Sequence, residues 1–261
     1  MIGLFLGDTD FSKIVLKKIK KLKKKYFIID FSKNNVFAKE KNSYRISIGK
    51  FGKIIDLIKK QKSNKVLFAG KIAKPKFSTL RLDLKGIYYM PSIIKAAKKG
   101  DAAIIKAIIE ILKNEKIEVL SSIHFNPELT GKKGIHTKIK PSWTDIQSIN
   151  RGIKFLAKTN SYDHIQALIV KENNIIAKED NKGTKKMISK LKNNSGGILI
   201  KFPKKKQDLR MDLPTIGIQT IKDCKKYGLK GIVLKSKKNI FLDKSKSIEF
   251  ADKNKIFILI K

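Results

Sequence analysis

Short apolar runs alternate with amphipathic stretches through the first half of the chain, and this alternation constrains the fold more than any other feature. Four runs have the length and composition of buried strands: Ile2–Leu6, Tyr26–Phe31, Val66–Ala69 and Ile117–Leu120. Between them apolar residues recur at helical spacing, most clearly at Phe51, Ile54, Ile55 and Ile58. Strand–helix alternation of this kind predicts a Rossmann-like parallel sheet with helices on its faces.

The second half also alternates, but in a different order. Ile165–Val170 and Ile175–Lys178 flank Glu172-Asn173-Asn174, which predicts a hairpin. Gly183-Thr184 opens a short helix, and a longer helix is expected from about Pro214, because proline suits a first helical turn, to Tyr227. Further strands are expected at residues 198–202, 231–234, 240–242 and 256–260. Together these elements predict a mixed α/β domain.

The pattern lapses between Pro127 and Pro141, where LTGKKGIHTKIKP shows no sustained period. We therefore expect two domains: residues 1–130, a linker at 131–141, and residues 142–261. Trp143 is expected to be a packing residue where the second domain begins.

The chain is strongly basic, with 60 Lys+Arg against 22 Asp+Glu and a net charge of +38. Its arginines are only Arg45, Arg81, Arg151 and Arg210, whereas nucleic-acid readers use arginine heavily for bidentate contacts. The lysines are spread along the chain, which is typical of solvated surface. We expect nonspecific attraction to polyanions and anionic membranes, and no specific nucleic-acid partner.

Cysteine and histidine offer little for chemistry. Cys224 is alone, which fits a reducing compartment. His124, His136 and His164 lack the spacing of a zinc site, and each is interpreted as structural. No apolar run approaches the roughly 20 residues of a membrane span, so we expect a cytoplasmic protein that is at most peripheral to a membrane.

Two loops of the first half are possible ligand sites. Gly7-Asp8-Thr9-Asp10 follows the first strand, where nucleotide folds place phosphate, although Asp8 or Asp10 as a helix N-cap is the competing interpretation. Ala69-Gly70-Lys71 ends the third of these runs; small residues there admit a ligand to the backbone and Lys71 suits a phosphate. The alternative is a strand-ending glycine with an exposed lysine.

The stretch from Gly197 to Thr220 combines a buried strand, a basic loop and several polar side chains. Asp212, with Asp208 as a weaker second, is the best ligand on offer for Mg²⁺, which prefers oxygen. Lys201 and Arg210 suit phosphate oxygens, and Gln207 suits a ligand or water. A polar connection capped by Asp212 is the alternative that spacing alone favours.

Several motifs resemble one family over nearly the whole chain and in the same order. They are GKFGKIIDLIK from Gly49, VLFAGKIAKPKFSTLRLD from Val66, PSIIKAAKKGDAAIIKAI from Pro91, KGT from Lys182, KQDLRMDLPTIGIQTI from Lys206, YGLKGIVL from Tyr227, and Ala251-Asp252. The chain thereby resembles the metal-dependent UDP-2,3-diacylglucosamine pyrophosphatase of lipid A biosynthesis, the non-calcineurin type found in many Gram-negative bacteria.

The resemblance implies an N-terminal UDP-binding domain, a C-terminal catalytic domain and a cleft for the lipid-linked nucleotide sugar between them. It implies hydrolysis to UMP and 2,3-diacylglucosamine 1-phosphate with Mg²⁺ or another divalent cation, and makes a homodimer plausible. The catalytic aspartate of the family's DLPTIG motif carries over to Asp212. We expect substrate contacts from ten residues: Gly7, Asp8, Ala69, Gly70, Lys71, Thr184, Lys201, Gln207, Arg210 and Thr215.

The chain departs from the family at three acidic positions, which are lysines here: Lys182, Lys185 and Lys235. These lysines either supply fixed positive charge to phosphates or mark an altered activity. Three hypotheses follow: the pyrophosphatase, a relative that binds nucleotide sugar or lipid without hydrolysis, and a basic nucleic-acid-binding protein.

Overall fold

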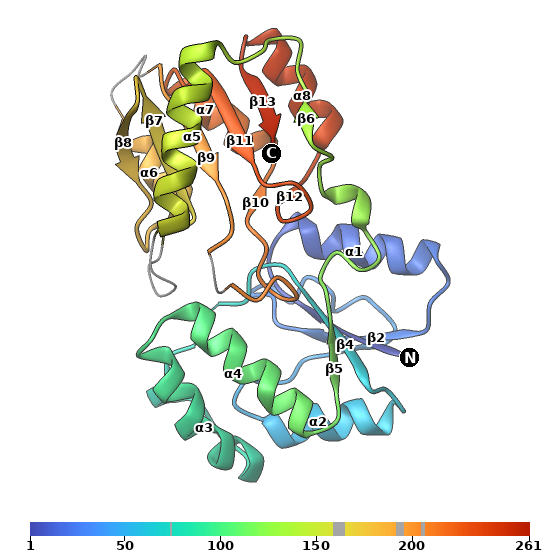
Figure 1. Ribbon diagram of the computed structural model, residues 1–261. Coiled ribbons are helices and arrows are strands. Elements are labelled where there is room, and N and C mark those ends of the chain that lie inside the picture. The colour runs from blue at the N-terminus through green and yellow to red at the C-terminus, as the bar shows by residue number, and fades with distance from the viewer. Residues whose placement is uncertain (74, 159–164, 192–195, 205–206) are drawn as a thin grey trace. The chain divides into compact units, whose positions relative to one another are not determined.

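The computed structural model describes residues 1–73, 75–158, 165–191, 196–204 and 207–261 (Figure 1). The chain forms two compact units, each with its own sheet and hydrophobic core. Unit 1 comprises Met1–Asn126 with Asp208–Asp212, and unit 2 comprises Pro127–Gln207 with Leu213–Lys261. The two-domain α/β architecture predicted from the sequence is confirmed.

Unit 1 is built on a five-stranded sheet in which every pairing is parallel. Its order is β3 (Ser43–Tyr44), β2 (Tyr26–Asp30), β1 (Ile2–Leu6), β4 (Lys65–Ala69), β5 (Glu118–Leu120). Figure 1 shows α1 (Asp10–Lys21) on one face of this sheet, and α2 (Phe51–Lys60) and α4 (Asp101–Asn114) on the other. The predicted apolar stripe of α2 is buried in the core, so the helical spacing of these residues correctly identified the packed face of the helix.

A further helix, α3 (Leu84–Ala97), packs against α2 and α4 although Pro91 lies inside it. The sequence analysis did not predict this helix. Its N-terminus is capped by Asp83, whose Oδ1 accepts a hydrogen bond from the backbone N–H of Gly86 at 2.8 Å.

Unit 1 also contains Asp208–Asp212, a segment far along the chain. The backbone N–H of Ser122, just after β5, donates to the carbonyl oxygen of Arg210 at 2.8 Å. Met211 packs against the unit 1 core. The structure therefore differs from an uninterrupted domain over residues 142–261, because five residues of that range belong to unit 1.

Unit 2 has a mixed six-stranded sheet and a parallel pair. The sheet order is β6 (Gly134–Ile135), β13 (Phe257–Ile260), β11 (Gly231–Leu234), β9 (Ile198–Lys201), β7 (Ala167–Lys171), β8 (Asn174–Lys178). Strands β13, β11 and β9 pair in parallel, and the remaining pairings are antiparallel, including the predicted β7–β8 hairpin. The separate pair is β10 (Thr215–Ile216) with β12 (Ile240–Phe241).

Helix α5 (Trp143–Lys158) contributes to one of the two hydrophobic clusters of unit 2. Three further helices contribute to the other cluster: α6 (Gly183–Ser189), α7 (Ile218–Lys226) and α8 (Lys244–Lys253). Two 3₁₀ turns, Phe77–Thr79 and Pro127–Leu129, complete the described elements.

Several local predictions are corrected. Pro214 does not start a helix: β10 follows it, and α7 begins only after Gly217. The expected linker includes β6, which pairs with β13 and so belongs to the sheet. Trp143 is 75% exposed and is not a packing residue. The helix after β1 takes Thr9 as its N-cap without a side-chain bond, so neither Asp8 nor Asp10 caps it. His164 lies outside the described residues.

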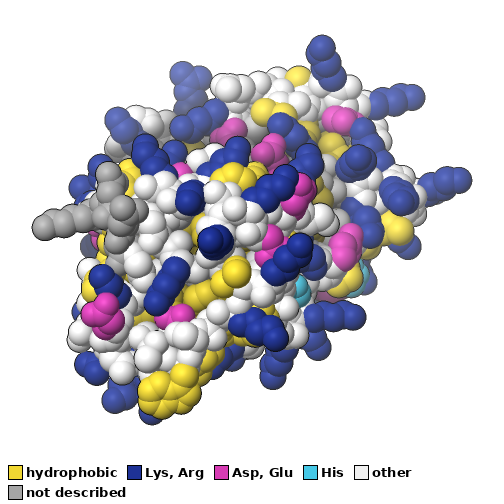
Figure 2. All heavy atoms as spheres, turned by 90° about the horizontal axis from the view of Figure 1, so that it is seen from above, with side chains coloured by type: hydrophobic (Ala, Val, Ile, Leu, Met, Phe, Trp, Pro, Cys, Tyr) yellow, Lys and Arg dark blue, Asp and Glu magenta, His cyan; other side chains and the backbone are white. Residues whose placement is uncertain are grey.

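No helix in the described part of the chain combines the length and apolar character needed to cross a membrane. Figure 2 shows one face of the molecule, on which Lys and Arg side chains are scattered instead of gathering into one patch.

Candidate functional site

The loops that follow β1 and β4 are joined backbone to backbone at the carboxyl edge of the unit 1 sheet. Asp8 and Lys71 form an isolated antiparallel bridge, with N–H···O distances of 2.8 and 2.7 Å. The N–H of Gly7 donates to the carbonyl oxygen of Ala69 at 2.9 Å. These amides are therefore engaged within the fold, so a ligand here would meet side chains and not a cradle of open N–H groups.

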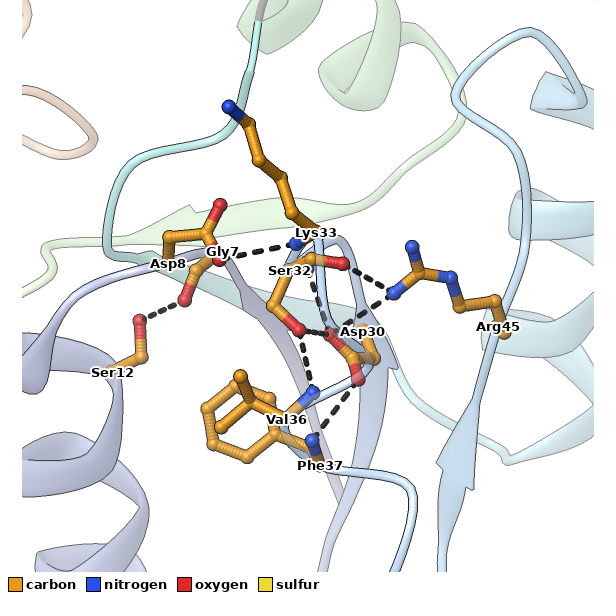
Figure 3. Close-up of polar contacts among 9 residues, drawn as sticks. All are labelled: Gly7, Asp8, Ser12, Asp30, Ser32, Lys33, Val36, Phe37 and Arg45. Atoms are coloured by element: carbon orange, nitrogen blue, oxygen red, sulfur yellow. Dashed lines mark hydrogen bonds and ion pairs between the residues drawn. The ribbon is translucent and has the colours of Figure 1, made fainter.

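Close packing between the two loops explains why both carry glycine. The buried Oγ of Ser12 lies 2.8 Å from the carbonyl oxygen of Gly7 (Figure 3). It lies 2.8 Å from the carbonyl oxygen of Ala69 as well, so its single proton is shared between the two acceptors. A Cβ on Gly70, whose φ is +84°, would lie 2.0 Å from that Oγ. A Cβ on Gly7 would lie 2.3 Å from the carbonyl oxygen of Lys71. Close chain approach, and not an approaching ligand, accounts for glycine at both positions.

Asp30 organises the loop after β2 and was missed by the sequence analysis. Its carboxylate, 1% exposed, accepts hydrogen bonds from the Ser32 N–H at 2.8 Å, the Ser32 hydroxyl at 2.6 Å and the Phe37 N–H at 3.1 Å. Arg45 lies 3.7 Å away as an ion-pair partner and also donates to the Ser32 carbonyl oxygen (Figure 3). An acid at the end of the second strand was the available signal, since dinucleotide folds place a ribose ligand there.

The hydrogen bonds of Asp30 fix the loop that carries Lys33, and this loop contacts the loop after β1. The backbone N–H of Lys33 donates to Asp8 Oδ1 at 3.1 Å, as Figure 3 shows. Asp8 therefore fastens the β2 loop to the β1 loop. The buried carboxylate of Asp30 shapes the protein and is not presented to a ligand.

The segment Asp208–Asp212 forms a compact turn at the same edge of the sheet. The N–H groups of Met211 and Asp212 point to the carbonyl oxygen of Asp208, at 3.3 and 3.1 Å. Ser122, which binds Arg210, lies just beyond β5, and carboxyl ends of parallel strands share one edge. Half-buried Asp212 is thereby on the edge that carries the Gly7 and Gly70 loops.

Asp208 and Arg210 form an ion pair with each other. Arg210 donates from Nε and Nη2 to the two carboxylate oxygens at 3.0 and 2.7 Å, and its backbone N–H adds a third bond at 3.0 Å. The side-chain hydrogen bond from Arg210 is the main reason that the pKa of Asp208 lies below its usual range. Phosphate binding by Arg210 therefore requires it to share or leave Asp208.

Two buried polar atoms in the loop after β5 have no hydrogen-bond partner within the described part of the chain: Ser122 Oγ and Asn126 Oδ1. Their residues are 1% and 3% exposed. Neither was predicted from the sequence, where the available signal was the serine pair directly after a buried strand.

The fit to Mg²⁺ rests on the oxygen donors of this turn. Among the described residues, no group of three or more His, Cys, Asp or Glu is placed to hold a metal ion. Mg²⁺ commonly uses one or two carboxylates with substrate phosphates and water, and Asp212 fits that arrangement as a single carboxylate. Asp208 fits as a second ligand only if Arg210 yields one of its oxygens.

In unit 2, two of the predicted residues contact each other at the end of β9. Lys201 Nζ donates to Thr184 Oγ1 at 2.9 Å, and Thr184 Oγ1 donates to Glu179 Oε1 at 2.5 Å. Glu179 is 8% exposed and its other oxygen accepts the Gln166 N–H at 3.0 Å. Glu179, which the sequence analysis missed, orients the hydroxyl to which Lys201 binds. An isolated acid just before the KGT motif was its signal.

The neighbouring strand end adds a second buried organiser. Asn239, 2% exposed, donates to the Lys201 carbonyl oxygen at 3.0 Å and accepts the Lys235 N–H at 2.9 Å. Lys235 Nζ lies 5.5 Å from the centre of the Phe202 ring. The carboxyl ends of β9 and β11 thus each carry a lysine: Lys201 reaches Thr184, whereas Lys235 lies over Phe202.

The other predicted residues of unit 2 are placed as follows. Lys182 and Lys185 are exposed on the first turn of α6 and just before it. Gln207 is buried, and its Oε1 accepts the Lys204 N–H at 2.9 Å. Thr215 lies in β10 and donates to the Leu213 carbonyl oxygen at 3.1 Å.

A groove of about 750 Å³ lies between α5 and the β7–β8 hairpin. Arg151, Lys154 and Lys158 line it together with Phe155 and Ile175. It contains none of the predicted site residues.

Comparison with known proteins points to one family. Two family models match, described as the LpxI N-terminal domain over residues 1–129 and the LpxI C-terminal domain over residues 132–259. The UDP-2,3-diacylglucosamine pyrophosphatase LpxI of Caulobacter vibrioides is 30% identical over 224 residues, which is 82% of this chain and 80% of that protein.

Proposed function

The chain belongs to the LpxI family, and from that membership we propose that it hydrolyses the pyrophosphate bond of UDP-2,3-diacylglucosamine. Water adds to one phosphorus, the bond to the bridging oxygen breaks, and the products are UMP and 2,3-diacylglucosamine 1-phosphate. The proposed role is a step of lipid A biosynthesis. Support comes from the name of the similar Caulobacter protein and from the match over both domains.

One structural observation carries the proposal to particular residues. The Asp208–Asp212 turn, which contains the aspartate of the DLPTIG motif, lies at the carboxyl edge of the unit 1 sheet. Ligands of open α/β sheets bind at that edge. Asp212 is therefore proposed as the catalytic residue that holds the attacking water and accepts its proton.

Mg²⁺ or another divalent cation is proposed at Asp212. When bound, it would neutralise phosphate charge and polarise a phosphoryl oxygen. The protein's part is to supply the Asp212 carboxylate, while Asp208 stays engaged with Arg210.

Positive side chains are proposed to bind the phosphates. Lys201 is oriented by Thr184 and Glu179, so its ammonium group keeps a defined place. Lys71 follows Gly70 at the edge of the unit 1 sheet. Arg210 holds Asp208 through Nε and Nη2 and shares its remaining guanidinium N–H groups with the phosphates. Fixed charges of this kind stabilise negative charge that develops on phosphoryl oxygens.

Lys182, Lys185 and Lys235 stand where the family has acidic residues. The proposed mechanism takes its metal ligand from Asp212 and needs no carboxylate at those three positions. Lys235 is held near Phe202 beside the Lys201 strand end, where it adds positive charge. Gln207 and Thr215 are proposed to position substrate next to the turn that they flank in sequence. We also propose that the protein binds peripherally to an anionic membrane and that it forms a homodimer.

The proposal is tested by incubating the purified chain with UDP-2,3-diacylglucosamine and Mg²⁺ or Mn²⁺ and following UMP release. We expect release that stops when EDTA is added and resumes with excess metal. Substrate binding by calorimetry without UMP release under any metal would instead establish a relative that binds the nucleotide sugar and does not hydrolyse it.

A further inference from the structure

Helix α3 exposes an unusual amount of apolar surface. Among the described residues, eleven large apolar side chains are exposed, and four of them lie on this one helix: Leu84 (86%), Ile87 (59%), Tyr88 (77%) and Ile94 (41%). The remaining seven are distributed over the rest of the described chain. Concentration on one element is the kind of exposure that marks an interaction surface.

The exposed side chains form one stripe. Positions 84, 87, 88, 91 and 94 follow helical spacing, and Pro91 between them is exposed as well. The opposite face of α3 is packed, with Met90 and Ile93 buried against Phe51 and Ile111. Figure 1 shows α3 beside α4, and the stripe is the side of α3 turned away from that packing.

Positive charge surrounds the stripe. Arg81 precedes it, and exposed Lys95, Lys98 and Lys99 follow it along the helix axis. Of the nearby acids, Asp83 caps α3 and Glu115 accepts bonds from Lys59 and Lys85, while exposed Asp101 follows the lysines at the start of α4. The surface is thus apolar in the middle and cationic at its ends.

We infer that α3 docks on an anionic lipid bilayer, with Leu84, Ile87, Tyr88 and Ile94 in the interface and the flanking lysines on headgroup phosphates. Interfacial helices combine an apolar face with Lys and Arg in this way. A second copy of the chain fits less well, because pairing two stripes would bring the same lysines face to face in a protein of net charge +38. The inference deepens the proposed function and rests on it for its purpose, since a lipid-linked substrate is met at a bilayer.

The test is sedimentation of the full-length chain with vesicles of phosphatidylcholine and phosphatidylglycerol in roughly a two-to-one ratio, at about 0.15 M salt. The stripe variant is Leu84→Gln, Ile87→Gln and Tyr88→Gln together, which keeps good helix formers on an exposed face. Its matched control removes three scattered exposed apolar side chains, Leu22→Gln, Ile135→Gln and Ile176→Gln. We expect the stripe variant to lose at least about tenfold in vesicle affinity and the control to change less than about twofold.

The lysines are tested by Lys95→Gln, Lys98→Gln and Lys99→Gln against three exposed lysines of α1 and the turn after it, Lys17→Gln, Lys21→Gln and Lys24→Gln. Both variants lose three positive charges. We expect the first variant to bind vesicles several-fold more weakly than the second. Circular dichroism checks that each variant is folded.

UMP release from detergent-dispersed substrate separates docking from catalysis, because the stripe variant should keep that activity. Wild-type protein that ignores the anionic vesicles, or equal losses in stripe and control variants, would overturn the inference. A stripe variant that changes only the oligomeric state measured by light scattering would assign the stripe to a second copy and would also overturn it. If neither the wild type nor any variant releases UMP, the proposed reaction is wrong, and the vesicle measurements still decide whether α3 docks on the bilayer.

Discussion

At the scale of single residues, the structure explains why position 70 is occupied by glycine. From the sequence, Gly70 either lets a ligand reach the backbone of the β4 loop or is a strand-ending glycine followed by an exposed lysine. In the structure, the space that a side chain would need holds Ser12 Oγ and the carbonyl oxygens of Gly7 and Asp8. Glycine at the end of this strand was predictable, whereas its contact with a serine 58 positions earlier in the chain was not, because only folding brings them together.

Gly70→Ala should lower the free energy of unfolding by roughly 2–4 kcal/mol. The new methyl group requires Ser12 to move away from two carbonyl oxygens, and alanine is strained at φ +84°. Urea denaturation measures the change. Gly183→Ala is the matched control, since its φ is +83° and a Cβ there meets nothing within 4 Å; it should cost only about 1 kcal/mol. Equal costs at both positions would contradict the role given to Ser12.

Glu115 shows how a charge can be kept ionised while mostly buried. Burial alone would raise its pKa, but hydrogen bonds from Lys85, Lys59 and Tyr89 outweigh burial and lower the pKa from 4.5 to about 2. A lowered folded-state pKa gives stabilisation that is complete above the unfolded pKa of 4.5 and is lost as the pH falls towards 2.

Glu115→Gln should therefore be less stable than wild type by roughly 1–3 kcal/mol at neutral pH, with the gap closing between about pH 4.5 and 2. Urea denaturation across that range measures the gap. Glu118→Gln is the control, because its carboxylate is 59% exposed and pairs only at the surface with Lys65; it should change stability by less than about 0.5 kcal/mol at any pH. A gap that is independent of pH would contradict the ionised cluster.

At the scale of elements, the period of apolar residues predicted the longer strands and most helices. Helix α3 was not predicted; it contains Pro91 and is held by packing on α2 and α4. Pro214 suggested a helix start, but Thr215–Ile216 pairs with Ile240–Phe241, a partner that sequence spacing does not reveal. Trp143 was expected inside because it is apolar, and it lies outside at the start of α5.

Asp83 joins two of these helices. Its Oδ1 accepts the Gly86 N–H at the start of α3, and its Oδ2 accepts the Lys53 N–H in the first turn of α2 at 3.1 Å. Asp83→Ala should cost about 1–3 kcal/mol in unfolding free energy, because two helix N-termini lose an acceptor and a favourable charge. Asp10→Ala, in the exposed first turn of α1, should cost less than about 1 kcal/mol. Thermal denaturation compares the two variants, and equal losses would show that Asp83 caps neither helix.

At the scale of the whole molecule, the chain enters unit 1 twice. The motif order predicted two domains, yet no pattern in the sequence indicated that Asp208–Asp212 would fold with the first of them. The backbone bond to Ser122 and the packing of Met211 decide it, and both are contacts between residues at least 88 positions apart. The predicted site residues are consequently divided, with Asp208, Arg210 and Asp212 in unit 1 and Thr184, Lys201, Gln207 and Thr215 in unit 2.

The central claim is that hydrolysis depends on Asp212 at the edge of the unit 1 sheet. The direct measurement is kcat for UMP release by wild type, Asp212→Asn and Asp208→Asn, each checked for folding. Removing a carboxylate that holds the water and metal should lower kcat by about a thousandfold or more, with KM little changed. Asp208→Asn, whose carboxylate serves Arg210, should lose far less. Wild-type kcat in Asp212→Asn, or an equal loss in both variants, would contradict the account.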